Sequence, residues 1–271
     1  MRKRLPTMRR LVWLAGLAGL AACTAPPAAA PQTGDSKDRV TASDQTDASR
    51  RANVRLQLAS AYFADGQLAT ALDEVKQALL ADPKMTEAYN LRGLIYAGLG
   101  DNTLAEESFR HALQLNPRDA DVMQNYGWYL CMQKRYGEAS AQFQQALAQP
   151  QYRDATRTLL TQGVCEARAG QLAEAERTLM SAYALDAANP AIALNLSEVL
   201  FQRGEYERAR FYIRRVNASP QQTSAQSLWL AVRIEVRGGN AQAARELGAQ
   251  LVARYPKSPE AAAFQQGKFD G

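Results

Sequence analysis

Residues 89–117 read YNLRGLIYAGLGDNTLAEESFRHALQLNP and carry the signals of two short helices joined by a turn. Gly100 and Asp101 mark the turn, and Pro117 marks the end of the second helix. Gly93 and Ala105 stand where the two helices would cross, and small side chains there allow the helices to approach closely. The stretch therefore predicts a helical hairpin.

The same pattern recurs along most of the chain. Alanines at the equivalent place of each second helix are spaced by 34, 34, 36, 34 and 35 residues. A fixed period of this length is the signature of stacked helical repeats. The two longer spacings predict loop insertions near residues 154–155 and 224. The alanines that set the register are Ala71, Ala105, Ala139, Ala175, Ala209 and Ala244.

Two further positions follow this register. A small residue stands twelve places before each of the first five alanines, and a large residue stands four places after most of them. The small residues are Ala59, Gly93, Gly127, Gly163 and Ser197, and the large ones are Phe109, Phe143, Leu179 and Ile213. The sixth unit departs from the pattern, with Val232 at the small position and Gly248 at the large one. Terminal repeats are commonly atypical because they cap the stack.

Units of this kind resemble tetratricopeptide repeats (TPR), which are 34 residues long. The resemblance implies an all-α fold, a right-handed superhelical solenoid of six helix pairs. We expect residues 259–271 to form a C-terminal cap or tail after the repeats. The predicted units are residues 52–85, 86–119, 120–153, 156–189, 190–223 and 225–258.

The start of the chain carries an export signal. Residues 1–10 are basic, residues 11–22 are apolar, and Cys23 follows. The apolar run is too short to cross a bilayer, which needs about 20 residues, but it suits a secretory signal. Residues 20–23, Leu-Ala-Ala-Cys, resemble a lipobox. We therefore expect residues 1–22 to be a lipoprotein signal peptide and Cys23 to be lipidated, the alternative being an ordinary signal peptide and a spare cysteine.

The segment after the lipobox is poor in large apolar side chains. Residues 24–49 contain no aromatic residue, and Val40 is the only large aliphatic one. Such a composition cannot bury enough apolar surface to fold. We expect residues 23–51 to form the lipidated cysteine and a flexible tether. Thr24 follows the cysteine, and by resemblance to known lipoproteins the absence of aspartate there favours the outer membrane, with the chain facing the periplasm.

Composition excludes several functions. The net charge of +5 equals the number of basic residues in residues 1–10, so the chain is neutral without that segment and gives no sign of binding nucleic acid. One histidine and three cysteines offer little for a metal site or a histidine-based triad. The sequence shows no phosphate-binding loop, nucleophile elbow or paired-carboxylate motif. We expect no enzyme, no small-molecule substrate, no metal and no cofactor other than the lipid.

Three stretches point to a narrower family. They are NYGWYLC at 125–131, VLFQRGEYERARFYI at 199–213 and SLWLAVRIEVRGGNAQAARELGAQLVARYPKSPE at 227–260. Together they resemble the type IV pilus biogenesis and stability TPR lipoproteins, the PilF/PilW family. The resemblance implies a pilotin that helps the pilus secretin to localise or multimerise. The alternative is a TPR lipoprotein of the outer-membrane β-barrel assembly machinery or another periplasmic scaffold, because ARYPKSPEAAAF resembles a motif found there too.

The first helices of stacked TPR units line a concave groove. In this register the groove positions are apolar with few charges, so we expect them to bind a segment of the pilus secretin, with Trp128 as a candidate anchor. Packing of Trp128 against the next repeat is the alternative reading. The predicted groove residues in the first three units are Leu56, Phe63, Asn90, Leu94 and Trp128.

Cys131 and Cys165 are the two cysteines left if Cys23 carries lipid. They fall late in the first helices of neighbouring units, which pack side by side, and export would place them in an oxidising compartment. Some members of the resembled family carry a bridge between their third and fourth repeats. We expect a disulfide between them, with two buried free thiols as the alternative.

Overall fold

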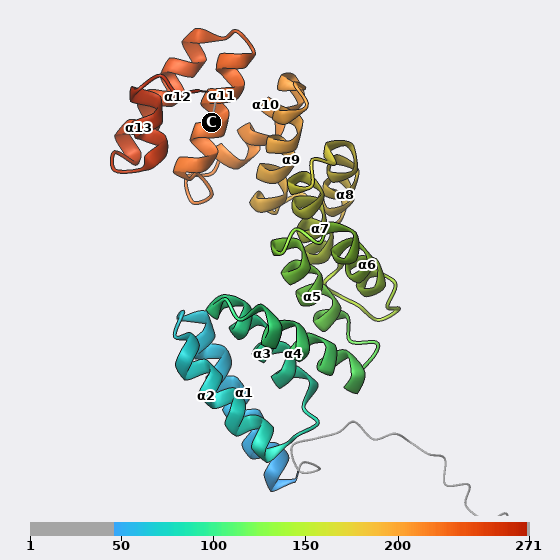
Figure 1. Cartoon of the computed structure of the whole chain (residues 1–271). Coiled ribbons are helices and arrows are strands. Elements are labelled where there is room, and N and C mark those ends of the chain that lie inside the picture. The colour runs from blue at the N-terminus through green and yellow to red at the C-terminus, as the bar shows by residue number, and fades with distance from the viewer. Residues whose placement is uncertain (1–45, 270–271) are drawn as a thin grey trace, which may run out of the picture. The chain divides into compact units, whose positions relative to one another are not determined.

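The computed structural model describes residues 46–269, which form thirteen α-helices and no strand (Figure 1). The all-α fold class predicted from the repeats is confirmed for this part of the chain. Residues 1–45 and 270–271 lie outside the described residues. The predicted signal peptide (1–22) and the predicted lipidation site Cys23 therefore lie outside them as well.

Twelve of these helices form six consecutive pairs, and a short thirteenth follows. The pairs are α1 (Asp47–Ala64) with α2 (Leu68–Ala81), α3 (Thr86–Leu99) with α4 (Asn102–Leu115), α5 (Ala120–Met132) with α6 (Tyr136–Leu147), α7 (Ala155–Arg168) with α8 (Leu172–Leu185), α9 (Pro190–Gln202) with α10 (Tyr206–Asn217), and α11 (Ala225–Arg237) with α12 (Ala241–Arg254); α13 spans Pro259–Gln265. Each pair corresponds to one predicted unit.

The tether prediction was wrong at its C-terminal end. We expected the tether to run to residue 51, whereas α1 begins at Asp47. The Thr46 hydroxyl accepts a hydrogen bond from the backbone N–H of Ser49, and Asp47 places a carboxylate at the positive end of the helix dipole. Ala52, at the start of the predicted unit, is fully buried. The helix therefore begins one full turn before its first buried side chain, where composition still resembles a tether.

The first helix of each pair lies beside the first helix of the next. Contacts join α1 to α3, α3 to α5, α5 to α7, α7 to α9, and α9 to α11. In the first five pairs, each second helix packs between its own first helix and the first helix of the following pair, whereas α12 packs between α11 and α13. The first helices therefore form a continuous row across all six units, which we call the first-helix row.

Small residues allow the two helices of a pair to cross closely. A methyl group added at Gly127 would lie 2.8 Å from the ring of Phe143, and one added at Gly163 would lie 2.6 Å from Leu179. In the fifth pair the small residue is Ser197, whose hydroxyl donates a 2.9 Å hydrogen bond to the carbonyl of Ala209. The register alanines and the large residues that follow them are buried throughout.

In the sixth pair, the small and the large residue of the repeat pattern are exchanged. Val232 is fully buried where other units have a small residue, and Gly248 stands where they have a large one. The ring of Phe264, on α13, occupies the space beside Gly248, since an added Cβ there would lie 1.9 Å from it. The atypical unit is thus complementary to the closing helix, which covers α11 and α12.

The turn inside each pair contains one residue with positive φ, five places before the register alanine. Glycine fills this position in five of the six units, at residues 66, 100, 170, 204 and 239. The third unit has Lys134 there, with φ of 60°. A non-glycine residue in this conformation costs about 1–2 kcal/mol, so the tertiary packing of the third pair overrides a local preference.

Within residues 46–269, none of the helices combines the length and the apolar character needed to cross a bilayer.

Gly127→Ala should lower the free energy of unfolding by about 1–3 kcal/mol, because the added methyl group would overlap the fully buried ring of Phe143. Gly137→Ala is the matched control, since a Cβ at this position of α6 meets no atom within 4 Å. That change should be neutral or stabilising by up to about 1 kcal/mol, because alanine favours helix over glycine. Urea unfolding of both variants measures the difference. A Gly127→Ala protein as stable as the Gly137→Ala protein would contradict a close crossing.

Candidate functional site

The first-helix row carries all five residues that the sequence predicted for a partner-binding groove. Leu56 and Phe63 lie on α1, Asn90 and Leu94 on α3, and Trp128 on α5, and each is half-buried. Leu56 and Phe63 pack in part against the core of the first repeats. Leu94 packs in part against the core of the next repeats. These side chains therefore stabilise the stack and also leave part of their surface on the row; their contact with a partner stays a prediction.

Amide groups link three neighbouring helices of this row. The Asn125 side-chain amide on α5 donates a 3.2 Å hydrogen bond to Oδ1 of Asn90 on α3. Arg157 on α7 donates a 2.9 Å hydrogen bond to Oδ1 of Asn125 and a second, short one to Oε1 of Gln124. A polar ladder thus runs beside the apolar residues of the row. The repeat register did not predict these hydrogen bonds of Arg157, because the two partners lie more than thirty residues earlier in the sequence.

Trp128 has a cation as its neighbour. The guanidinium of Arg168, on α7, lies 5.4 Å from the centre of the Trp128 ring. Nη1 of the same guanidinium lies 2.8 Å from Sδ of Met132, whose side chain is 48% exposed. Attraction between a cation and a ring contributes about 0.5–1 kcal/mol at exposed sites. Trp128 therefore packs in part against the next repeat, as the alternative reading expected, and leaves the rest of its side chain exposed.

Directly beside this cluster, Cys131 on α5 and Cys165 on α7 form a disulfide, with their Cα atoms 5.8 Å apart. Both cysteines are buried. The bridge ties the third unit to the fourth at the place where Trp128 and Arg168 meet, so it limits how far these two side chains can separate.

A second pair of an arginine and a ring lies further along the row. Arg233 of α11 lies 4.5 Å from the ring centre of Phe201 on α9. Glu198 stands 3.8 Å from the same guanidinium. The row is therefore not uniformly apolar, because arginines cover aromatic rings at two of its junctions.

Ionic contacts join the second unit to the third. Arg135 contacts the carboxylate of Glu106 through both terminal nitrogens, at 2.7 and 3.1 Å, and the Tyr126 hydroxyl donates to the same carboxylate at 3.0 Å. The hydrogen bonds from Arg135 hold the pKa of Glu106 below its usual range. The carboxylate is thus ionised, and it joins α4 to Tyr126 on α5 and to Arg135 in the turn that follows α5.

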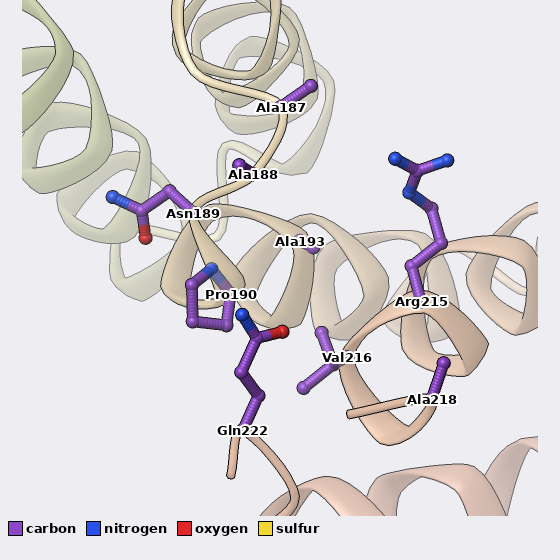
Figure 2. Close-up of a pocket in the computed structure, with 9 residues that line it drawn as sticks. All are labelled: Ala187, Ala188, Asn189, Pro190, Ala193, Arg215, Val216, Ala218 and Gln222. Carbon is purple, nitrogen blue, oxygen red and sulfur yellow. The ribbon is translucent and has the colours of Figure 1, made fainter. Parts of the chain in front are cut away.

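Two open hollows lie at loops between units. One of about 380 Å³ lies between the α8–α9 loop and the end of α10 (Figure 2). Another of about 430 Å³ is lined by residues 149–152 with Arg118 and Ala120. None of the five predicted groove residues lines either hollow. Among residues 46–269, no group of three or more histidine, cysteine or carboxylate side chains is arranged to hold a metal ion.

Stacked helix pairs with a continuous row of first helices define a helical-repeat scaffold that presents side-chain surfaces to other molecules. Three family models described as tetratricopeptide repeat match residues 84–151, 127–190 and 166–228. The chain thus has the features of a TPR protein along its central repeats.

Individual relatives narrow this class. The type IV pilus assembly protein PilF of Pseudomonas aeruginosa is 29% identical over 213 residues, which cover 79% of this chain and 84% of PilF. The structure of PilW, a widely conserved type IV pilus biogenesis factor, is 34% identical with a TM-score of 0.74, over 79% of this chain and 98% of PilW. A structure of Pseudomonas aeruginosa PilF is 27% identical with a TM-score of 0.70, over 82% of this chain and all of that one.

The chain belongs to the tetratricopeptide-repeat proteins, and within them it is a homologue of PilF and PilW, the type IV pilus biogenesis TPR proteins. TPR scaffolds of this kind are non-catalytic modules for protein interaction.

Proposed function

We propose that this protein is a pilotin for type IV pilus biogenesis, an outer-membrane lipoprotein that binds the pilus secretin subunit and assists its localisation and multimerisation. The observation that carries the proposal is a row of half-exposed apolar side chains in a chain homologous to PilF and PilW. The protein acts by binding, with no catalysis, small-molecule substrate or nucleic acid, and its only covalent group is the lipid on Cys23.

The chemistry of the first-helix row suits a protein segment. Leu94 and Trp128 offer apolar surface, and Asn90 keeps amide protons available beside them, since its oxygen accepts from Asn125. An apolar segment of the secretin would cover Leu94 and Trp128 and would hydrogen-bond to the amides. Aromatic anchors of this kind commonly dominate binding energy at protein interfaces.

The lipid on Cys23 would hold this row close to the outer membrane, where a secretin subunit arrives. One acyl chain gives marginal membrane binding, whereas two or more anchor a protein stably. A tether raises the effective concentration of the row for any partner at the same membrane. Modest affinity for each subunit is then enough for assembly.

The double variant Phe63→Ala with Trp128→Ala should strongly reduce heat-resistant secretin multimers in cells. Truncation of an aromatic anchor typically costs about 2 kcal/mol, or about 30-fold in affinity. Leu80→Ala is the control, because this side chain is 76% exposed on α2, outside the row. Multimers are measured by immunoblot, and circular dichroism of each purified protein reports folding. Normal multimers in a folded double variant would reject the row as the binding site.

A further inference from the structure

Helix α10 presents an exposed stripe that the first-helix row does not include. The residues of the stripe stand at the spacing of one helix face, and all of them are exposed. They are Phe211, Arg214 and Arg215, with Ala218 directly after the end of the helix. Phe211 is 56% exposed although it is a large aromatic residue. Because α10 is the second helix of its pair, this stripe lies outside the groove predicted on the first helices.

Two hollows lie beside this stripe, and Arg215 lines both of them. Figure 2 shows the first, of about 380 Å³, with Val216 and Ala193 at its base and Pro190 beside them. Val216 and Ala193 are each 3% exposed, so the base of the hollow is apolar. The second hollow, of about 390 Å³, is lined by Glu207, Arg210, Phe211, Arg214, Arg215 and Ala218. The two share Arg215 and Ala218, so they form one continuous surface, and each has the size of a small ligand pocket.

Arg215 differs from the other arginines of α10 in its partners. Arg208 pairs with Glu176 and Glu205, Arg210 with Glu207 and Glu235, and Arg214 with Glu235. No carboxylate among the described residues forms an ion pair with Arg215. Instead its guanidinium lies 6.0 Å from the ring centre of Tyr183 and 5.8 Å from that of Phe211.

The surroundings of Arg215 favour binding of a negatively charged group to its guanidinium. The guanidinium lies beside two aromatic rings, and stacking of this kind reduces the rotational freedom that it loses on binding. The charge faces outward and is not neutralised by the protein. Arg210 and Arg214, which also line the second hollow, already pair with Glu207 and Glu235. Arg215 is the one cation among the residues that line the hollow over Val216 and Ala193. One unpaired arginine offers too few donors to surround a phosphate, but it suits a carboxylate attached to an apolar segment.

We propose that this surface, the Arg215 surface, docks a segment of a partner protein that carries a large apolar side chain next to aspartate or glutamate. The apolar side chain enters the hollow over Val216 and Ala193, and the acidic residue pairs with Arg215. Phe211 covers the neighbouring part of the segment. This inference is independent of the first-helix row and of the identity of the partner there.

The test uses the full chain and three fluorescein-labelled peptides: GSDLFDSG, its basic counterpart GSKLFKSG, and GSDAADSG without the large apolar side chains. Fluorescence anisotropy should show the first peptide binding about tenfold more tightly than either of the others, a difference of about 1.4 kcal/mol. Arg215→Glu should reverse the order of the acidic and basic peptides, because like charges then oppose the acidic one. Phe211→Ala should weaken the first peptide with no change in charge preference.

Arg245→Glu makes the same charge change at an exposed position of α12 and should leave the order of the peptides unchanged. Equal affinities for the three peptides, or no measurable binding, would overturn the proposal. So would an unchanged preference in an Arg215→Glu protein whose circular dichroism shows normal folding. Full displacement of the first peptide by inorganic phosphate alone would show a simple anion site, and that result would also overturn it.

Discussion

Replacing both Cys131 and Cys165 by alanine is expected to lower the free energy of unfolding by about 4 kcal/mol. The bridge closes a loop with a sequence separation of 34 residues, and the chain-entropy relation gives about this value for such a loop. Both side chains are buried, so alanine adds no buried polar group. The loss corresponds to a change of about a thousandfold in the folding equilibrium.

Urea unfolding of the full chain without reductant measures this effect. Adding dithiothreitol to the wild-type protein is the control, and it should lower the stability by a similar amount while leaving the double variant unchanged. The denatured, unreduced wild-type chain should also offer no more than one reactive thiol, that of Cys23. Two or more reactive thiols, or a wild-type stability insensitive to dithiothreitol, would show that the bridge does not form in solution.

Cys23→Ser should remove nearly all of the protein from the outer-membrane fraction. Burial of each methylene group of an acyl chain contributes about 0.8 kcal/mol to membrane binding, and serine cannot accept the lipid through a thioether. Secretin multimers in the outer membrane should fall as well, even though Phe63 and Trp128 are intact. The expected change in distribution is the largest that a single substitution in this chain should produce.

Cell fractionation followed by immunoblotting measures the distribution. Ala25→Ser is the control, because it changes a neighbouring residue and leaves residues 20–23, the predicted lipobox, unchanged. Mass spectrometry of the mature N-terminal peptide should find an acylated Cys23 with no residue before it. An unmodified Cys23 in protein from the native host, or retention of residues 1–22, would contradict the lipoprotein assignment.

The helix pairs could be predicted from the sequence because their packing rule is local. Ala105, Gly93 and Phe109 occur at a fixed spacing within one unit, and each must be small or large for the two helices to cross. The structure places them as the spacing requires, with Ala105 and Phe109 fully buried. Repetition of the rule across the chain then gave the number of pairs.

Contacts between units could be predicted only in part. The candidate groove positions followed from the register, and the structure brings them to one row. Arg157 and Arg168 reach into the preceding repeat, to Asn125 and Trp128, across more than thirty residues. Long side chains of this kind adopt one of several directions, and the repeat pattern does not specify which. The covering of Trp128 by Arg168 could therefore not be predicted from the sequence.

Departures from the repeat were equally hard to predict. The sequence marked Gly248 as an exception without indicating that Phe264 of α13 fills the space beside it. Lys134 takes a left-handed turn position that glycine occupies in the other units. The start of α1 depended on a cap at Thr46, which acts over three residues, whereas composition is averaged over a longer segment. In each case tertiary or capping contacts overrode the average pattern.

The central claim is that the first-helix row binds the pilus secretin, and site-specific photo-cross-linking in cells tests it most directly. A benzophenone amino acid is placed at Leu94, which is half-buried on the row, or at Leu80, which is exposed on α2. After irradiation, mass spectrometry should identify the secretin subunit joined to position 94 and not to position 80. Equal secretin capture at both positions, or capture at position 94 of a β-barrel assembly protein instead of the secretin, would contradict the account.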